Sequence, residues 1–256
     1  MTIVTLTGTI GDDIIDTSAF DIPGVTQYVI VGRDGNDTII TNNVSQDIRG
    51  GRGDDYILSG NGDDIINAGN GADRVFGGRG ADVINGAGGD DYIDGGHGND
   101  VIDGGSGNDF IFGRKGNNIL DGGAGNDVVN TGDHTSIANG GTGDDLIVAR
   151  LKKGADHTLT GGEGADTFEF VYQSAKRSSD VTITDFELGV DEFIVGGVTG
   201  LEWAALFVAG DVALNASDNS AGGTEIDMGF NDTLTLDDVS FGDFLSYYIS
   251  EALLMA

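Results

Sequence analysis

Hydrophobic and polar positions in the first two-thirds of the chain repeat every nine residues, and nine such nonapeptides fill residues 50–130 without a gap. Position 4 is glycine in every clear copy, position 6 is aspartate except at Asn118, and position 8 is aliphatic except at Phe168. Two weaker copies, residues 41–49 and 131–139, keep the register but lose most of these residues. The thirteen clear copies begin at Gly8, Gly32, Gly50, Ser59, Ala68, Gly77, Gly86, Gly95, Gly104, Gly113, Gly122, Gly140 and Gly161.

Each position of the repeat has a physical reason. Glycine at positions 1, 2 and 4 allows backbone angles that other residues disfavour, so the first six residues can turn sharply. The last three residues alternate outward, inward and outward around one aliphatic side chain, which is the pattern of a short strand. One turn and one strand make half a coil, so eighteen residues complete a coil that stacks on the previous one at about 4.8 Å. The pattern predicts an all-β solenoid of stacked coils over residues 1–170, with a ragged first coil at 1–31.

Composition narrows the function classes. The chain has 46 glycines, one proline and a formal net charge of -31, which disfavours binding to nucleic acid or to an anionic membrane. A hydrophobic content of 38% argues against disorder, so an acidic chain of this kind is expected to fold by binding cations. The absence of cysteine excludes disulfides and thiolate metal sites. No apolar stretch approaches the ~20 residues of a membrane span.

The repeat resembles that of the RTX (repeats-in-toxin) family, as in Gly95-Gly-His-Gly-Asn-Asp-Val-Ile-Asp103. The resemblance covers roughly residues 8–170 and implies a right-handed parallel β-roll with several Ca²⁺ ions between stacked turns. Calcium takes six to eight oxygen ligands. In the family, one turn gives the carbonyls of positions 2 and 4 and its aspartate, and the turn eighteen residues later gives the carbonyls of positions 1 and 3 and its own aspartate.

Carried over to this chain, the resemblance implies nine calcium sites. The sites pair Asp37–Asp55, Asp55–Asp73, Asp64–Asp82, Asp73–Asp91, Asp82–Asp100, Asp91–Asp109, Asp109–Asp127, Asp127–Asp145 and, more weakly because Asn118 lacks the charge, Asp100–Asn118. The implied ligands are Arg33, Gly35, Asp37, Gly50, Gly51, Arg52, Gly53, Asp55, Gly60, Gly62, Asp64, Ala68, Gly69, Asn70, Gly71, Asp73, Gly77, Gly78, Arg79, Gly80, Asp82, Gly86, Ala87, Gly88, Gly89, Asp91, Gly95, Gly96, His97, Gly98, Asp100, Gly104, Gly105, Ser106, Gly107, Asp109, Gly113, Lys115, Asn118, Gly122, Gly123, Ala124, Gly125, Asp127, Gly140, Thr142 and Asp145.

The sequence does not decide whether the aspartates outside the regular repeats bind calcium. The weak copies are expected to leave gaps in the file of ions. The eighteen-residue spacing breaks at residues 17–22 and 149–151, which leaves undecided whether Asp13 and Asp166 bind calcium. Asp185 and Asp191, beyond the repeats, are either extra ligands or surface turn residues. The alternative, that the aspartates are solvated turn residues, is disfavoured because stacked carboxylates without a cation repel one another.

The region 171–256 is expected to be a small mixed cap with an export signal. Residues 164–170 and 183–191 resemble the end of serralysin-like and other type I-secreted proteins, which implies a cap on the last coil. We expect a short helix at 201–208 and a strand, turn and strand within 212–228. The ending Glu251-Ala-Leu-Leu-Met-Ala256 resembles an uncleaved type I secretion signal, and residues 1–16 show no cleavable signal. We therefore expect the type I secretion machinery to be a partner and the protein to be extracellular.

No catalytic motif accompanies the repeats. None of the three histidines His97, His134 and His157 lies in a His-Glu-x-x-His motif, and no Gly-x-Ser-x-Gly elbow is present. We expect a secreted calcium-binding protein that is not an enzyme, folds on export in extracellular calcium, and has a structural or adhesive role at the cell exterior. The alternative is a polysaccharide-binding module without its own catalytic domain, as in the repeat modules attached to mannuronan epimerases.

Two surface patterns bear on partners. Arg79, His97 and Lys115 all occupy position 3, eighteen residues apart, and are expected to stack as a basic stripe that contacts an acidic polysaccharide or simply relieves local acidity. The outward positions of one sheet are mostly aromatic or aliphatic, and we expect this face either to be covered by the cap, a second chain or a ligand, or to stay exposed. Its outward residues include Tyr56, Leu58, Phe76, Tyr92, Phe110, Phe112, Leu146 and Val148.

Overall fold

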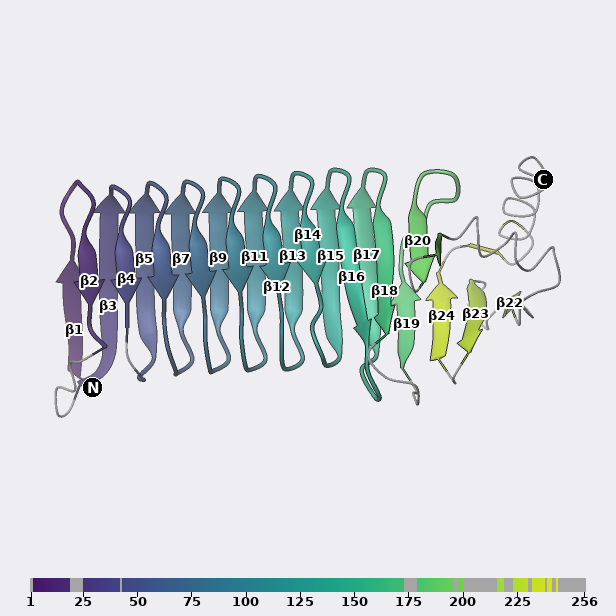
Figure 1. The fold of residues 1–256 in the computed structure, drawn as a ribbon, viewed down its shortest axis with the longest axis horizontal. Helices are drawn as coiled ribbons and strands as arrows, with labels where there is room; N and C mark the ends of the chain where they lie inside the picture. The colour runs from purple at the N-terminus through teal and green to yellow at the C-terminus, as the bar shows by residue number, and fades with distance from the viewer. Residues whose placement is uncertain are drawn as a thin grey trace.

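The computed structural model describes residues 2–18, 25–41, 43–172, 179–195, 198–199, 216–218, 223–229, 232–237, 239–240 and 243. Its named elements are strands, arranged as two long sheets that run the length of an elongated roll (Figure 1). Through the repeats the chain passes from one sheet to the other at each turn, so that consecutive strands there alternate between the sheets. The prediction of an all-β parallel β-roll is confirmed.

One sheet has thirteen strands and the other eleven. In spatial order the larger sheet contains β1 (Thr2–Thr7), β3 (Val25–Asp34), β5 (Gln46–Arg52), β7 (Ile65–Asn70), β9 (Val83–Gly88), β11 (Val101–Ser106), β13 (Ile119–Ala124), β15 (Ser136–Thr142), β17 (His157–Glu163), β19 (Asp180–Ile183), β24 (Asp232–Leu236), β23 (Thr224–Gly229) and β22 (Ala216–Asp218). The smaller sheet contains β2 (Ile14–Asp16), β4 (Thr38–Ile40), β6 (Tyr56–Leu58), β8 (Arg74–Phe76), β10 (Tyr92–Asp94), β12 (Phe110–Phe112), β14 (Val128–Asn130), β16 (Leu146–Leu151), β18 (Thr167–Tyr172), β20 (Glu192–Val195) and β21 (Val198–Thr199).

The register between neighbouring coils is the eighteen-residue step that the sequence predicts. Ile93 pairs in parallel with Val75 before it and with Ile111 after it. At the two ends the step is longer, because Ile15 pairs with Ile39 and Ser136 pairs with His157. Extra residues between strands therefore do not disturb the stacking of the strands themselves.

The core is a double file of position-8 side chains, one file from each sheet. From Ile39 to Phe168 these side chains are at most 1% exposed. Since each coil contributes only two of them, the core is thin. The buried position-8 residues are Ile39, Ile48, Ile57, Ile66, Val75, Ile84, Ile93, Ile102, Ile111, Leu120, Val129, Ala138, Ile147 and Phe168.

Glycine at position 2 is required by the close stacking of the turns. Gly51 has a φ of 130°, and a Cβ atom there would overlap the carbonyl oxygen of Arg33 in the previous coil. Three non-glycine residues nevertheless occupy position 2 in the left-handed region: Arg33, Ala87 and Arg114, with φ of 97°, 78° and 60°. An L-residue in this region costs about 1–2 kcal/mol relative to the right-handed one.

The described C-terminal strands extend both sheets beyond the last coil. β24 pairs in parallel with β19, and β22 and β23 form the antiparallel pair expected within 212–228. The expected helix at 201–208 and the tail at 251–256 lie outside the described residues. Phe186 joins Phe168 and Phe193, with ring centroids 6.1 and 6.0 Å apart, and so closes this end of the core.

The aromatic face of the smaller sheet remains partly exposed. Tyr56 is 39% exposed and Phe110 is 50% exposed in the single chain. The larger sheet also exposes hydrophobic side chains, because its position-7 residues form an aliphatic row: Ile65, Val83, Val101, Ile119 and Ile137. Among the described residues, no helix is long and apolar enough to cross a membrane.

Candidate metal sites in the turns

The position-6 aspartates stack directly above one another along each edge of the roll. In every one of the nine predicted pairs, the backbone N–H of the first residue donates a hydrogen bond of 2.7–3.0 Å to Oδ1 of its partner eighteen residues later. Six pairs, from Asp37 to Asp145, follow one edge, and the three pairs from Asp64 to Asn118 follow the other. The structure therefore brings together all the side chains that the sequence paired, and their role as ligands stays a prediction.

The second carboxylate oxygen of these aspartates is buried and accepts no hydrogen bond from the described part of the chain. A buried polar atom without a partner costs about 1–3 kcal/mol, and more when it is charged. A whole file of such atoms therefore indicates that a cation belongs beside them. The orphaned Oδ2 atoms belong to Asp37, Asp55, Asp64, Asp73, Asp82, Asp91, Asp100, Asp109, Asp127, Asp145 and Asp166.

Backbone carbonyls of the next coil point into the same space. At Gly104 an added Cβ would lie 2.5 Å both from Oδ2 of Asp109 and from the carbonyl oxygen of Gly122, eighteen residues on. Glycine at position 1 thus leaves room where two oxygens from successive coils converge. Within the described ranges, no three His, Cys, Asp or Glu side chains gather as a metal site. The donors are a few carboxylates and many carbonyls, which is the hard-oxygen set that calcium prefers.

Burial changes the protonation of these carboxyl groups in the metal-free chain. Burial, and secondarily the charge of neighbouring carboxylates, raises the pKa of Asp73, Asp82, Asp91 and Asp145 to about 7. Burial also raises the pKa of Asp55 and Asp109 to about 6. A bound divalent cation acts in the opposite direction, because its charge stabilises the ionised form.

Comparison with known families decides what the repeat is. A family model of the RTX calcium-binding nonapeptide repeat (4 copies) matches residues 29–43, 45–75, 67–102, 76–111 and 103–133. Residues 29–133 are RTX repeats. RTX repeats bind calcium, so the matched part of the β-roll is a calcium-binding segment. No curated protein matches the chain.

Asn118 alters the RTX turn in a way that the spacing alone does not reveal. Its Oδ1 accepts the Asp100 N–H at 2.9 Å, so its Nδ2 takes the place of the orphaned carboxylate oxygen. This Nδ2 is buried without a hydrogen-bond partner, and an N–H donor cannot ligate a cation. In the following turn Ser136 stands at position 6, and its Oγ accepts the Asn118 N–H at 3.4 Å. Carboxylates therefore end on this edge after Asp100.

The file of aspartates extends beyond the regular repeats at both ends. The Asp13 N–H donates to Oδ1 of Asp37 at 2.8 Å across 24 residues, and the Asp145 N–H donates to Oδ1 of Asp166 at 3.0 Å across 21 residues. The Asp166 N–H in turn donates to Oδ1 of Asp191 at 3.1 Å. Both Asp166 and Asp191 precede a strand with an inward phenylalanine, and this signal could have placed them despite the broken spacing.

Asp185 and Asp191 use their carboxylates for backbone amides. Asp185 accepts the N–H groups of Gly161 and Gly162 at 2.9 Å each. Oδ2 of Asp191 accepts the N–H of Glu187 at 2.8 Å, so both of its oxygens are engaged. These two carboxylates therefore satisfy backbone amides of the turns at the C-terminal end of the roll.

Position 5 carries a second ladder that the sequence analysis missed. The Asp54 N–H donates to Oδ1 of Asn36 at 3.0 Å, and the Ala72 N–H donates to Oδ1 of Asp54 at 2.9 Å. The signal was available, because position 5 is Asp, Asn or Ala in all thirteen clear copies. These side chains satisfy turn amides and are exposed, so they do not add to the buried sites.

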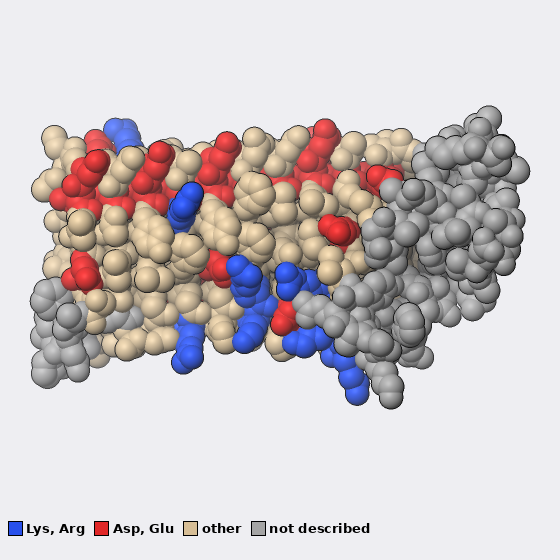
Figure 2. All heavy atoms as spheres, viewed as in Figure 1, with Lys and Arg blue, Asp and Glu red and all other residues tan. Residues whose placement is uncertain are grey.

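The position-3 stripe stacks as predicted. Arg79 pairs with His97 and His97 with Lys115 in successive parallel bridges. Figure 2 shows acidic side chains along one edge of the roll and basic side chains gathered near the middle of the opposite edge. The basic residues are therefore concentrated rather than spread evenly over an acidic surface.

Proposed function

We propose that the protein is an exported β-roll that folds when it meets extracellular calcium and then serves a structural or adhesive role at the cell exterior. The observation that carries this proposal is the file of buried aspartate Oδ2 atoms without hydrogen-bond partners. The proposed ligands are these oxygens and the carbonyls of positions 1 to 4, whereas the Asn118 side chain turns an N–H donor toward its site. Proteins with RTX repeats are typically extracellular, which supports the proposed location at the cell exterior.

The energetics favour calcium-dependent folding. Each coil buries two position-8 side chains, which contribute about 1.5–3 kcal/mol each. Ordering the backbone costs about 1–2 kcal/mol per residue over the eighteen residues of a coil. Metal binding must therefore supply a large part of the folding free energy. Extracellular calcium modules bind at about 10⁻⁴–10⁻³ M, which keeps such a chain unfolded in the cytosol.

A calcium titration tests the proposal directly. Circular dichroism and hydrodynamic radius are followed while calcium is added to the full chain in chelator, with magnesium at matched ionic strength as the control. We expect a compact β-structure with calcium and an expanded chain with magnesium. Full β-structure in excess chelator would overturn calcium-dependent folding. Export is tested separately by deleting residues 251–256 in a host with a type I secretion system.

A second candidate function is binding of an extracellular polysaccharide. The stacked position-3 stripe of Arg79, His97 and Lys115 favours it, because a row of cations on an otherwise acidic surface suits an acidic chain. It does not compete with calcium-dependent folding, since a folded roll is needed for either role.

A further inference from the structure

A cleft of about 360 Å³ opens on the roll where the basic stripe ends. Its lining includes His97, Arg114, Lys115, Asn130 and Arg150. These residues come from three successive coils and from the last residues of β16, so the cleft exists only when the coils are stacked.

Cations outnumber carboxylates around this cleft. The chain has only 12 lysines and arginines, and four of them, Arg114, Lys115, Arg150 and Lys152, belong to this region. The cleft carboxylate Asp94 is already bound by Arg114, with Nη2 to Oδ2 at 2.7 Å. Lys115 Nζ contacts the ring nitrogen Nε2 of His97 at 3.4 Å and forms no ion pair within the described ranges. An anion entering the cleft would therefore meet cations that are not fully neutralised.

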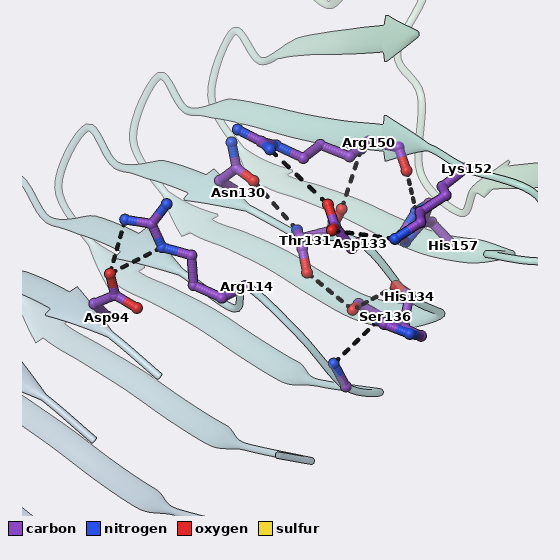
Figure 3. Close-up of polar contacts among 12 residues, drawn as sticks. Asp94, Arg114, Asn130, Thr131, Asp133, His134, Ser136, Arg150, Lys152 and His157 are labelled. Carbon is purple, nitrogen blue, oxygen red and sulfur yellow. Dashed lines mark hydrogen bonds and ion pairs between the residues drawn. The ribbon is translucent and has the colours of Figure 1, made fainter. Parts of the chain in front are cut away.

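The other carboxylate of the cleft, Asp133, is held between two cations. Lys152 lies 3.2 Å from Oδ2 of Asp133, and Arg150 lies 3.9 Å from its Oδ1 (Figure 3). Both cations come from the segment that lengthens the coil beyond eighteen residues. The extra residues in this coil therefore place two cations at the edge of the roll that carries the cleft.

The cleft lies at the weak copy 131–139, where side-chain hydrogen bonds hold the turns together. The Arg150 N–H donates to Oγ1 of Thr131 at 3.3 Å, and the Ser136 hydroxyl donates to the Thr131 carbonyl at 3.1 Å (Figure 3). Asp133 is at position 3, in line with the basic stripe, and Ser136 replaces the position-6 aspartate. The carboxylate of the repeat is thus lost at the place where the cations gather.

Arg114 is fixed in an unusual conformation within this cleft. It occupies a glycine position with a φ of 60°, and its guanidinium carbon lies 4.9 Å from the centre of the Phe112 ring. A strained backbone of this kind persists where surrounding contacts hold it and is common at binding sites. The contact with Phe112 is a cation–π interaction that keeps the guanidinium at the rim of the cleft.

An aromatic ladder leads across the smaller sheet to the cleft. Tyr56, Phe76, Tyr92 and Phe112 follow one another with ring centroids 5.6, 5.8 and 5.3 Å apart. The ladder ends at Phe112, against which Arg114 packs. Flat apolar surface and a cationic cleft are therefore continuous on one face.

We propose that the cleft and the aromatic ladder together bind a chain of acidic sugars, with an anionic group held near Lys115 and Arg150. The sugar rings lie along the ladder, whose rings offer apolar contact with a polar edge. This inference rests on the second candidate function and names its site and ligand class. The carboxylate of a uronate and the sulfate of a sulfated sugar share the chemistry that the cleft recognises.

Calorimetry on the full chain in saturating calcium tests the site. The probes are short oligogalacturonates, sulfated oligosaccharides of matched length, neutral cello-oligosaccharides and short polyglutamate, all at one fixed free calcium concentration. We expect saturable binding of one of the acidic sugars and none of the neutral sugar. The tighter acidic probe identifies the anionic group. Polyglutamate binding as tight as that of both sugars, or no saturable binding of any probe, would overturn the proposal.

Variants separate the cleft from general charge attraction. Lys115→Gln and Arg150→Gln are each expected to weaken binding about tenfold, which corresponds to losing one charge-assisted contact. Arg114→Gly removes a cation while relieving the positive φ, so it is expected to weaken binding without loss of thermal stability. The matched control, Arg49→Gln, removes an exposed cation that lies outside both the stripe and the cleft, and it is expected to change affinity less than twofold.

An equal loss in Arg49→Gln and Lys115→Gln would overturn the cleft as the site. Calcium-dependent circular dichroism is recorded for every variant. Normal folding without sugar binding rejects this inference and leaves calcium-dependent folding intact, so the two failures are distinguishable.

Discussion

Oδ1 of Asp109 accepts the backbone N–H of Asp91 at 2.8 Å, while Oδ2 of the same carboxylate is buried without a hydrogen-bond partner. One oxygen therefore fastens the coil before, and the other is left for a cation. This division of labour between two oxygens of one side chain recurs along both edges of the roll.

The division predicts the effect of Asp109→Asn. Asparagine keeps Oδ1 as an acceptor but replaces Oδ2 with an N–H donor, so the stacking survives and a ligand is lost. We expect a weaker calcium response and a lower melting temperature in calcium. The matched control is Asp103→Asn, which changes an outward position-9 carboxylate and is expected to leave both unchanged. Equal effects of the two substitutions would mean that net charge, rather than ligation, is responsible.

The reverse change, Asn118→Asp, is expected to stabilise the roll. The substitution removes a buried Nδ2 without a hydrogen-bond partner, and such an atom costs about 1–3 kcal/mol. It also supplies a carboxylate oxygen at the point beside Gly113 where the Thr131 carbonyl oxygen converges. Calcium affinity or melting temperature is expected to rise. The double variant Asn118→Asp/Ser136→Asp restores a full pair and is expected to bind additional calcium, measured by isothermal titration. If neither calcium affinity nor melting temperature rises, the interpretation of this turn as a weakened calcium site is wrong.

Acidification is expected to raise the stability of the metal-free folded chain. Burial raises the pKa of Asp73, Asp82 and Asp91 to about 7 in the folded chain, above their ordinary value of 3.8. The folded chain therefore binds more protons than the unfolded chain between these values, and its stability falls as pH rises through about 7. In excess chelator, β-structure is expected to increase from pH 7.5 to pH 5, whereas in saturating calcium it changes little. The measurement is circular dichroism with size-exclusion chromatography, and loss of structure on acidification in chelator would contradict it.

Ala87→Gly is expected to raise the stability of the calcium-bound protein. Ala87 has a φ of 78°, where an L-residue costs about 1–2 kcal/mol, and the greater freedom of glycine in the unfolded chain offsets about 0.5–1 kcal/mol of this. The net gain is about 0.5–1 kcal/mol in thermal unfolding. Ala124→Gly, at position 3 without a positive φ, is the control and is expected to lose about 0.5–1 kcal/mol. A loss in both variants would show that the left-handed angle is not costly here.

The period of nine predicted most of the fold because each position has one physical task. Position 8 must be apolar to be buried, and the side chains from Ile39 to Phe168 are buried as expected. Position 6 must offer an acceptor to the backbone N–H of the coil before it, and all nine expected pairs form this hydrogen bond. The file of position-6 aspartates continues through Asp166 although the spacing there changes, because loops absorb the extra residues without moving the strands.

Other features depend on contacts that no local pattern encodes. The Nδ2 orientation of Asn118 is set by the Asp100 N–H, eighteen residues away. The basic cleft needs Arg150, which arrives through a register break, to meet Lys115 from two coils earlier. The amide contacts of Asp185 likewise join segments whose spacing follows no repeat.

Each aspartate in the file belongs to two turns at once, since it receives the amide of the coil before and offers its second oxygen toward the coil after. The roll is therefore a one-dimensional lattice in which each site is coupled to its nearest neighbours. On the edge from Asp37 to Asp145 this lattice is unbroken, so we expect the binding of one ion to order the ligands of the next. On the other edge the lattice stops at Asn118. We therefore expect the two edges to form cooperative units of unequal length, and we expect the longer edge to set how sharply the chain responds to calcium.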